Sequence, residues 1–157
     1  MKIFIPLLFA LLITSLTQAQ TQMNTTTPRA AAQIDHIAIL VENLPESLSF
    51  YQKVFGFPRL EDPFRDEVHA WLGIGHGLSL HLIEDTWTSP TIDKNNHLCF
   101  AVSDLQGFID NLNRLEIGYE DWPGAKKSVT TRPDGIQQIY LQDPNGYWIE
   151  VNDSLRP

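Results

Sequence analysis

The chain has 157 residues, a formal net charge of −8 and a single cysteine, Cys99. The acidic excess argues against nucleic acid or an anionic membrane surface as a partner, because both repel a negatively charged protein. A lone cysteine also excludes an internal disulfide bond, so the fold must be stabilised by its core or by a bound metal ion.

Residues 1–19 have the pattern of a secretory signal peptide. Lys2 gives a basic start, residues 3–13 form an apolar run that is too short to span a bilayer, and Ala19 is a small residue suited to cleavage. We therefore expect an exported protein, periplasmic or secreted, without stable membrane insertion. The alternative is that the apolar run remains as an amino-terminal membrane anchor.

Residues 20–33 are polar and show no apolar periodicity. Such a segment buries too little surface to offset the entropy lost on ordering, which predicts a disordered linker. Residues 34–157 have the length of one ordinary domain with a single core.

This domain repeats itself, with one copy at about residues 34–84 and the other at about 97–152. Each copy opens on a histidine-bearing apolar strand, followed by a helix with a capping residue, Asn43 in the first and Asp104 in the second. Each helix is expected to stop at a glycine–aromatic pair, Gly56-Phe57 or Gly118-Tyr119.

Three further strands are expected in each copy. They are predicted at residues 57–60, 68–73 and 78–84 in the first copy, and at 127–131, 137–142 and 147–152 in the second. The predicted fold is therefore α+β, built from two tandem βαβββ modules.

The last predicted strand, in "DPNGYWIEV", is apolar except for Glu150. A buried carboxylate without a partner costs several kcal/mol or takes up a proton. The repeat indicates a partner, because His36 matches His97 and His81 matches Glu150. If the modules pair, these four residues meet, and imidazoles with one carboxylate suit a divalent ion such as Zn²⁺, Ni²⁺, Mn²⁺, Co²⁺ or Fe²⁺.

The two remaining histidines, His69 and His76, lie beside charged residues and in a glycine-rich turn. We assign both to the surface.

The segments "DHIAILV", "HLCFAV" and "DPNGYWIEV" together resemble the vicinal oxygen chelate superfamily, which includes glyoxalase I, extradiol dioxygenases and bleomycin-resistance proteins. The resemblance covers about residues 34–153 and implies a curved sheet around one metal site. It implies His36, His97 and Glu150 as ligands. His81 stands where glyoxalases more often have Glu or Gln, so it is either a fourth ligand or a base. Tyr147 replaces the family's usual Asn in the turn.

The chemistry implied by this resemblance is chelation of two neighbouring substrate oxygens by the metal. We expect a glyoxalase-like lyase or isomerase that acts on a small α-oxo or hydroxy-carbonyl compound, with Glu150 or His81 moving the proton. The expected substrate-binding residues are Arg132, Gln137, Tyr140 and Trp148.

Two alternatives remain open at this stage. One is an extradiol-type dioxygenase with iron held by two histidines and a carboxylate, and the other is a non-catalytic binding protein. The modules can pair within one chain or across a homodimer, and the sequence does not decide which.

Overall fold

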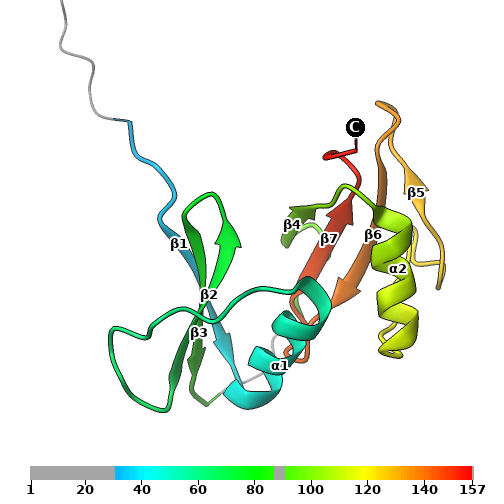
Figure 1. Ribbon diagram of the computed structural model, residues 1–157. Helices are drawn as coiled ribbons and strands as arrows, with labels where there is room; N and C mark the ends of the chain where they lie inside the picture. The colour runs from blue at the N-terminus through cyan, green and yellow to red at the C-terminus, as the bar shows by residue number, and fades with distance from the viewer. Residues whose placement is uncertain (1–30, 87–90, 157) are drawn as a thin grey trace, which may run out of the picture. The chain divides into compact units, whose positions relative to one another are not determined.

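The computed structural model describes residues 31–86 and 91–156 (Figure 1). The predicted signal peptide and most of the predicted linker lie outside the described residues. Residues 33–157 form one compact unit. Among the described residues, no helix has the length and apolar character needed to cross a membrane.

The first module contains β1 (His36–Val41), α1 (Leu44–Phe55), β2 (His69–Gly75) and β3 (Leu78–Glu84). Its sheet has the order β1-β3-β2, with β1 parallel and β2 antiparallel to β3 (Figure 1). The strand expected at residues 57–60 is reduced to an isolated bridge between Arg59 and Leu72. Pro58 limits pairing there, because it has no N–H to donate, although its carbonyl accepts from Gly73.

The second module contains β4 (His97–Ala101), α2 (Leu105–Arg114), β5 (Thr130–Thr131), β6 (Gln137–Gln142) and β7 (Trp148–Asn152). Its sheet has the order β4-β7-β6-β5, with β4 parallel to β7 (Figure 1). The strand expected at residues 127–131 is shorter, because Lys127 has a φ of 57°, outside the extended region. The predicted pair of βαβββ modules is otherwise confirmed.

Both helices begin where their caps predict. The side chain of Asn43 accepts a hydrogen bond from the Glu46 N–H at 2.9 Å, and Asp104 accepts one from the Gly107 N–H at 2.8 Å. Helix α1 ends at Gly56 in the left-handed conformation, with φ 69°.

The predicted stop of α2 at Gly118 is wrong. The left-handed residue there is Glu116, with φ 57°. Its N–H donates to the Asn113 carbonyl at 3.2 Å, and the Ile117 N–H donates to the Leu112 carbonyl at 2.9 Å. These two bonds form a Schellman motif, and they end the helix before Gly118 is reached.

The two modules share one hydrophobic cluster. Phe55 of α1 contacts Phe100 of β4 and Phe108 of α2, with ring centroids 5.1 Å and 5.4 Å apart. Polar contacts connect the same helix to the Asp-Pro-Asn-Gly turn between β6 and β7. Tyr51 donates to Asp143 at 2.9 Å, and Asn145 donates to Ser47 at 2.9 Å. The turn that precedes Glu150 is therefore fixed by the helix of the first module.

Candidate metal centre

His97 and Glu150 lie side by side on the neighbouring strands β4 and β7. His97 Nε2 is 3.3 Å from Glu150 Oε2, and the Glu150 side chain is only 8 % exposed. Parallel pairing places Cys99 opposite Glu150, so His97, two residues earlier on β4, shares that face of the sheet. The predicted meeting of an imidazole with the carboxylate is thus present within the second module.

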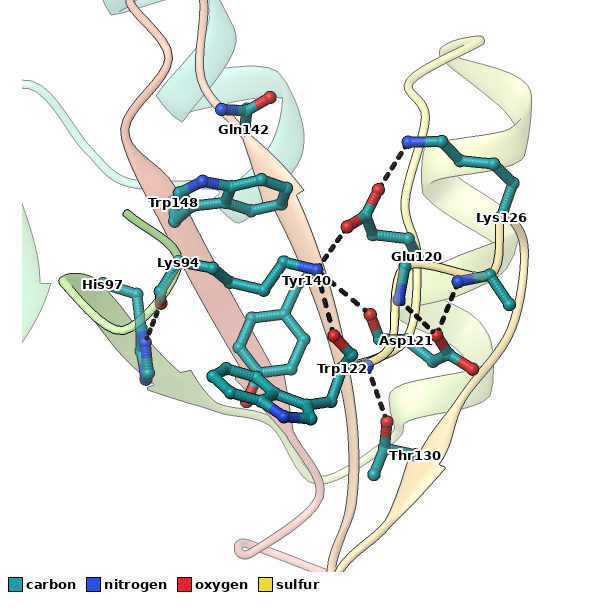
Figure 2. A network of polar contacts seen from close by, with 12 residues as sticks. Lys94, His97, Glu120, Asp121, Trp122, Lys126, Thr130, Tyr140, Gln142 and Trp148 are labelled. Carbon is teal, nitrogen blue, oxygen red and sulfur yellow. Dashed lines mark hydrogen bonds and ion pairs between the residues drawn. The ribbon is translucent and has the colours of Figure 1, made fainter. Parts of the chain in front are cut away.

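The orientation of His97 is set by its other ring nitrogen. Its Nδ1 lies 2.7 Å from the backbone carbonyl oxygen of Lys94, to which it donates (Figure 2). A neutral imidazole that donates from Nδ1 has a lone pair on Nε2. This lone pair faces a carboxylate oxygen, and a cation placed between the two atoms would be attracted by both.

Glu150 has three other partners within the second module. Its Oε2 accepts from the Tyr140 hydroxyl at 2.7 Å, and its Oε1 accepts from Asn152 at 2.9 Å and from the Cys99 thiol at 3.3 Å. Burial favours the neutral acid, but these hydrogen bonds and His97 outweigh it and lower the pKa of Glu150. The carboxylate therefore stays ionised at neutral pH inside an apolar strand.

The first module brings together the other predicted pair, His36 on β1 and His81 on β3. Their ring centroids are 5.9 Å apart, and His81 stacks on Trp71 at 3.9 Å. His36 Nδ1 contacts Asp35 at 2.7 Å, which leaves its Nε2 available for another ligand. His81 is 5 % exposed, and its Nε2 is buried without a hydrogen-bond partner. Such an orphaned nitrogen fits a ligand position.

The two pairs do not combine within one chain. Across residues 31–86 and 91–156, no three His, Cys, Asp or Glu side chains are grouped so that they could hold a metal ion. The expected four-residue centre is therefore not assembled among the described residues of one chain, and its members lie in two separate pairs, here called half-sites. Each includes a histidine on an edge strand, because β1 and β4 are the outermost strands of their sheets.

A shallow pocket of about 420 Å³, wide open to solvent and called the cavity below, lies beside the second half-site. Its lining combines the two candidate ligands with polar, cationic and aromatic side chains: His97, Trp122, Thr130, Thr131, Arg132, Pro133, Gln138, Tyr140 and Glu150. Of the predicted substrate-binding residues, Arg132 and Tyr140 line this cavity. Arg132 also pairs with Asp134 at 2.7 Å.

Two of the expected substrate-binding residues lie elsewhere. Gln137 is exposed, and its neighbour Gln138 lines the cavity and donates to the Tyr140 hydroxyl at 2.6 Å. Adjacent residues of a strand point to opposite faces of the sheet, so Gln137 and Gln138 face opposite sides. Trp148 donates its indole N–H to the Ile92 carbonyl at 3.1 Å and packs near Lys94 instead.

His69, which we assigned to the surface, also contacts one of the candidate ligands. Its ring stacks on His81 with centroids 5.2 Å apart, and its Nδ1 contacts Asp66 at 2.9 Å. Its position could have been inferred from strand alternation, since His69 and Trp71 share one face of β2, and Trp71 pairs with His81. His76 is exposed as expected, with φ 51°.

Comparison with known proteins gives a consistent picture. Residues 33–151 match the model of the Glyoxalase/Bleomycin resistance protein/Dioxygenase superfamily. The chain is 28 % identical over 134 residues to Glyoxylase I 4 of Arabidopsis thaliana, covering 79 % of this chain and 72 % of that protein. It is 30 % identical over 131 residues to the metallothiol transferase FosB of Shouchella clausii, covering 76 % of this chain and 78 % of the relative.

Solved structures support the same fold. A putative glyoxalase family protein from Bacillus anthracis superposes with a TM-score of 0.63 at 21 % identity, covering 79 % of this chain and 96 % of that one. The fosfomycin resistance protein FosX of Listeria monocytogenes gives a TM-score of 0.61 at 17 % identity, with 78 % and 93 % covered. The sequence match and the pair of βαβββ modules together show that the chain belongs to the glyoxalase/bleomycin resistance protein/dioxygenase superfamily.

Proposed function

We propose that the protein is a divalent-metal-dependent, glyoxalase-like lyase or isomerase for a small α-oxo or hydroxy-carbonyl compound. Its relatives include proteins named as a glyoxylase and a metallothiol transferase. The observation that carries the proposal is the His97–Glu150 pair, in which an imidazole lone pair and an ionised carboxylate face each other across 3.3 Å. The buried, unpartnered Nε2 of His81 supplies a further donor.

The complete centre is proposed to form in a homodimer, where His36 and His81 of one chain meet His97 and Glu150 of the other. A single chain leaves the pairs separate among its described residues. Among the described residues, the histidine-bearing strands β1 and β4 are each paired along one side only. Placing β1 of one chain beside β4 of a second would bring His36 towards His97, and twofold symmetry would create two such sites.

Three neutral imidazoles and one carboxylate fit Zn²⁺, Ni²⁺, Mn²⁺, Co²⁺ or Fe²⁺. When bound, the ion would polarise the substrate carbonyl and stabilise negative charge on its oxygens. The protein's own residues hold the substrate. Arg132 offers a cation to a carboxylate or phosphate group, and Trp122 offers an apolar surface in the same cavity.

Proton transfer is assigned to Glu150 or His81. Glu150 faces the cavity, and Tyr140 and Asn152 hold its carboxylate in one orientation. His81 would take this role when its Nε2 is not bound to the ion, and burial and the neighbouring His69 and His36 lower its pKa. A neutral imidazole and an ionised carboxylate are the forms that accept a proton. Both His81 and Glu150 are therefore suited to act as a base.

We also propose that the protein is exported, to the periplasm or the medium, on the basis of the amino-terminal pattern of residues 1–19. A substrate linked to glutathione is then a poor choice, because the thiol pool is cytosolic. Amino-terminal sequencing of protein recovered outside the cytosol should begin near Gln20. A start at Met1 would contradict export by cleavage.

Metal content is the first test. The purified, reconstituted protein should hold a stoichiometric transition metal, and His36→Ala and Glu150→Ala should each lose it. If the wild type binds none, a non-catalytic binding protein becomes the better interpretation. If the iron-loaded protein converts catechol and oxygen to a yellow ring-opened product, the dioxygenase alternative is favoured.

Mixing the two variants tests the dimer. A chain with His36→Ala and a chain with Glu150→Ala form, in each mixed dimer, one intact site and one doubly mutated site. With random exchange, about one quarter of all sites should regain metal. If mixing restores none although the subunits exchange, the centre does not form between two chains.

A further inference from the structure

Lys94 has a half-enclosed ammonium group in the segment that leads into β4. Its side chain is 17 % exposed and forms an ion pair with Glu120. The nitrogen lies 4.5 Å from the ring centroid of Trp148, 5.4 Å from that of Tyr140 and 6.0 Å from that of Trp122 (Figure 2). Aromatic faces at these distances attract a cation.

All three donors of this ammonium have acceptors. Besides Glu120, they reach the backbone carbonyls of Asp121 and Trp122, each at 3.3 Å. An ammonium with three hydrogen bonds and three aromatic neighbours has little freedom to move. The Lys94 side chain therefore fixes its own backbone, and the neighbouring Ile92 is fixed by the Trp148 indole.

The other end of Lys94 touches the candidate metal centre. Its backbone carbonyl accepts the Nδ1–H of His97 at 2.7 Å (Figure 2). In known metal sites, the group bound to the far nitrogen of a histidine ligand sets its tautomer and ring orientation. Here that group is a carbonyl in a loop, so its position depends on what holds the loop.

We propose that Lys94 is a positioning residue that, through its caged side chain, holds the His97 imidazole in the Nδ1–H tautomer with Nε2 presented for metal binding. The role in metal binding rests on the proposed function. The role in orienting the ring belongs to the protein without metal.

The alternative is that Lys94 has a purely structural role. Glu120 is 7 % exposed, and Lys94 would then serve only to neutralise the buried charge of Glu120, without orienting His97. Lys126 pairs with the same carboxylate through the other oxygen, but its side chain is 78 % exposed and makes no contact with His97 among the described residues. Lys126→Met is therefore the matched control for Lys94→Met.

The first experiment measures the His97 tautomer in the metal-free protein by long-range ¹⁵N–¹H correlation NMR. The wild type and Lys126→Met should show protonated Nδ1, whereas Lys94→Met should show a mixture of tautomers. Lys94→Arg should recover the wild-type pattern in large part, because a guanidinium also pairs with carboxylates and stacks on aromatic rings.

The second experiment measures Zn²⁺ affinity by competition with a chromophoric chelator. Lys94→Met should bind Zn²⁺ about tenfold more weakly, at the lower end of the loss seen when a histidine ligand loses its outer partner. Lys126→Met should match the wild type. Glu120→Gln, which weakens the anchor and leaves no buried anion, should fall between them and replaces Lys94→Met if that variant does not fold.

A Lys94→Met protein that keeps the wild-type tautomer would overturn the proposal, as would equal effects of Lys94→Met and Lys126→Met. If the wild type binds no Zn²⁺, the proposed function fails. The tautomer comparison would still decide whether Lys94 orients His97.

Discussion

The hydrogen bond between Tyr51 and Asp143 gives a sharp test of how the two modules are connected. Tyr51 is fully buried on α1, and its hydroxyl donates to Asp143 Oδ2 at 2.9 Å in the turn before β7. Tyr51→Phe removes one hydrogen bond to a charged acceptor and leaves the ring in place. Such a bond contributes about 1.5–3 kcal/mol, so the free energy of unfolding should fall by about 2 kcal/mol.

The loss should depend on pH in a defined direction. Burial is the main influence on Asp143 and raises its pKa, while the hydrogen bond from Tyr51 opposes this. A raised folded-state pKa means that the contribution of Asp143 to stability is full below its unfolded pKa of about 3.9 and is lost as pH rises through the folded value. Removing Tyr51 raises the folded pKa further, so the variant should lose more stability at neutral than at acidic pH.

Urea unfolding followed by circular dichroism measures this effect. With a denaturant dependence of about 2 kcal/mol per molar, the midpoint should fall by about 1 M at pH 7. Tyr119→Phe is the control, because Tyr119 is also buried but its hydroxyl makes no hydrogen bond within the described part of the chain. The reasoning is refuted if both variants lose the same stability, or if the loss from Tyr51→Phe grows as the pH falls.

Three further predictions follow from single contacts. Cys99 is exposed, but loss of hydration around its sulfur, with Glu150 adding to it, raises the pKa of the thiol to about 12. Ellman's reagent at pH 8 should therefore label it much more slowly than free cysteine, and labelling at the rate of free cysteine would contradict this. Burial and Glu150 together raise the pKa of Tyr140. In Glu150→Gln, an ultraviolet titration should therefore show one tyrosine ionising at lower pH than in the wild type. Identical titration curves would count against the contact between Tyr140 and Glu150. Asp104→Ala should cost about 1 kcal/mol in urea unfolding through loss of the α2 cap, while Asp110→Ala on the same helix should change stability by less than about 0.5 kcal/mol.

Local chemistry made the helices predictable. Asn43 and Asp104 each satisfy an orphan N–H at a helix start, and Gly56 takes the left-handed conformation for which glycine has no steric cost. The end of α2 was missed because a glutamate, Glu116, adopts that conformation without the favourable residue. Its cost is offset by the two hydrogen bonds of the Schellman motif, which the sequence does not reveal.

Contacts that depend on strand pairing were harder to predict. The sequence predicted that His36, His81, His97 and Glu150 would meet. The structure places His97 beside Glu150, but among the described residues it groups no three of the four at one point. The stacking of His69 on His81 depends on how β2 and β3 pair. Whether Gln137 or Gln138 faces the cavity depends on which residues of β6 point to that side of the sheet. Lys94 lies in a loop without periodicity, so no sequence pattern indicated that its carbonyl would meet His97.

The environments of the two half-sites also account for the charge of the proposed centre. Glu150 is ionised because Tyr140, Asn152 and Cys99 donate to it, whereas the equivalent position in the first module is the 5 % exposed His81 beneath Trp71. A carboxylate in that aromatic setting would lose its hydration and find few donors, so a neutral imidazole suits the position. A divalent ion with three imidazoles and one carboxylate keeps one net positive charge, whereas two carboxylates would cancel it. In the proposed centre, the remaining charge and the Arg132 guanidinium in the cavity would together favour substrates whose chelating oxygens are anionic.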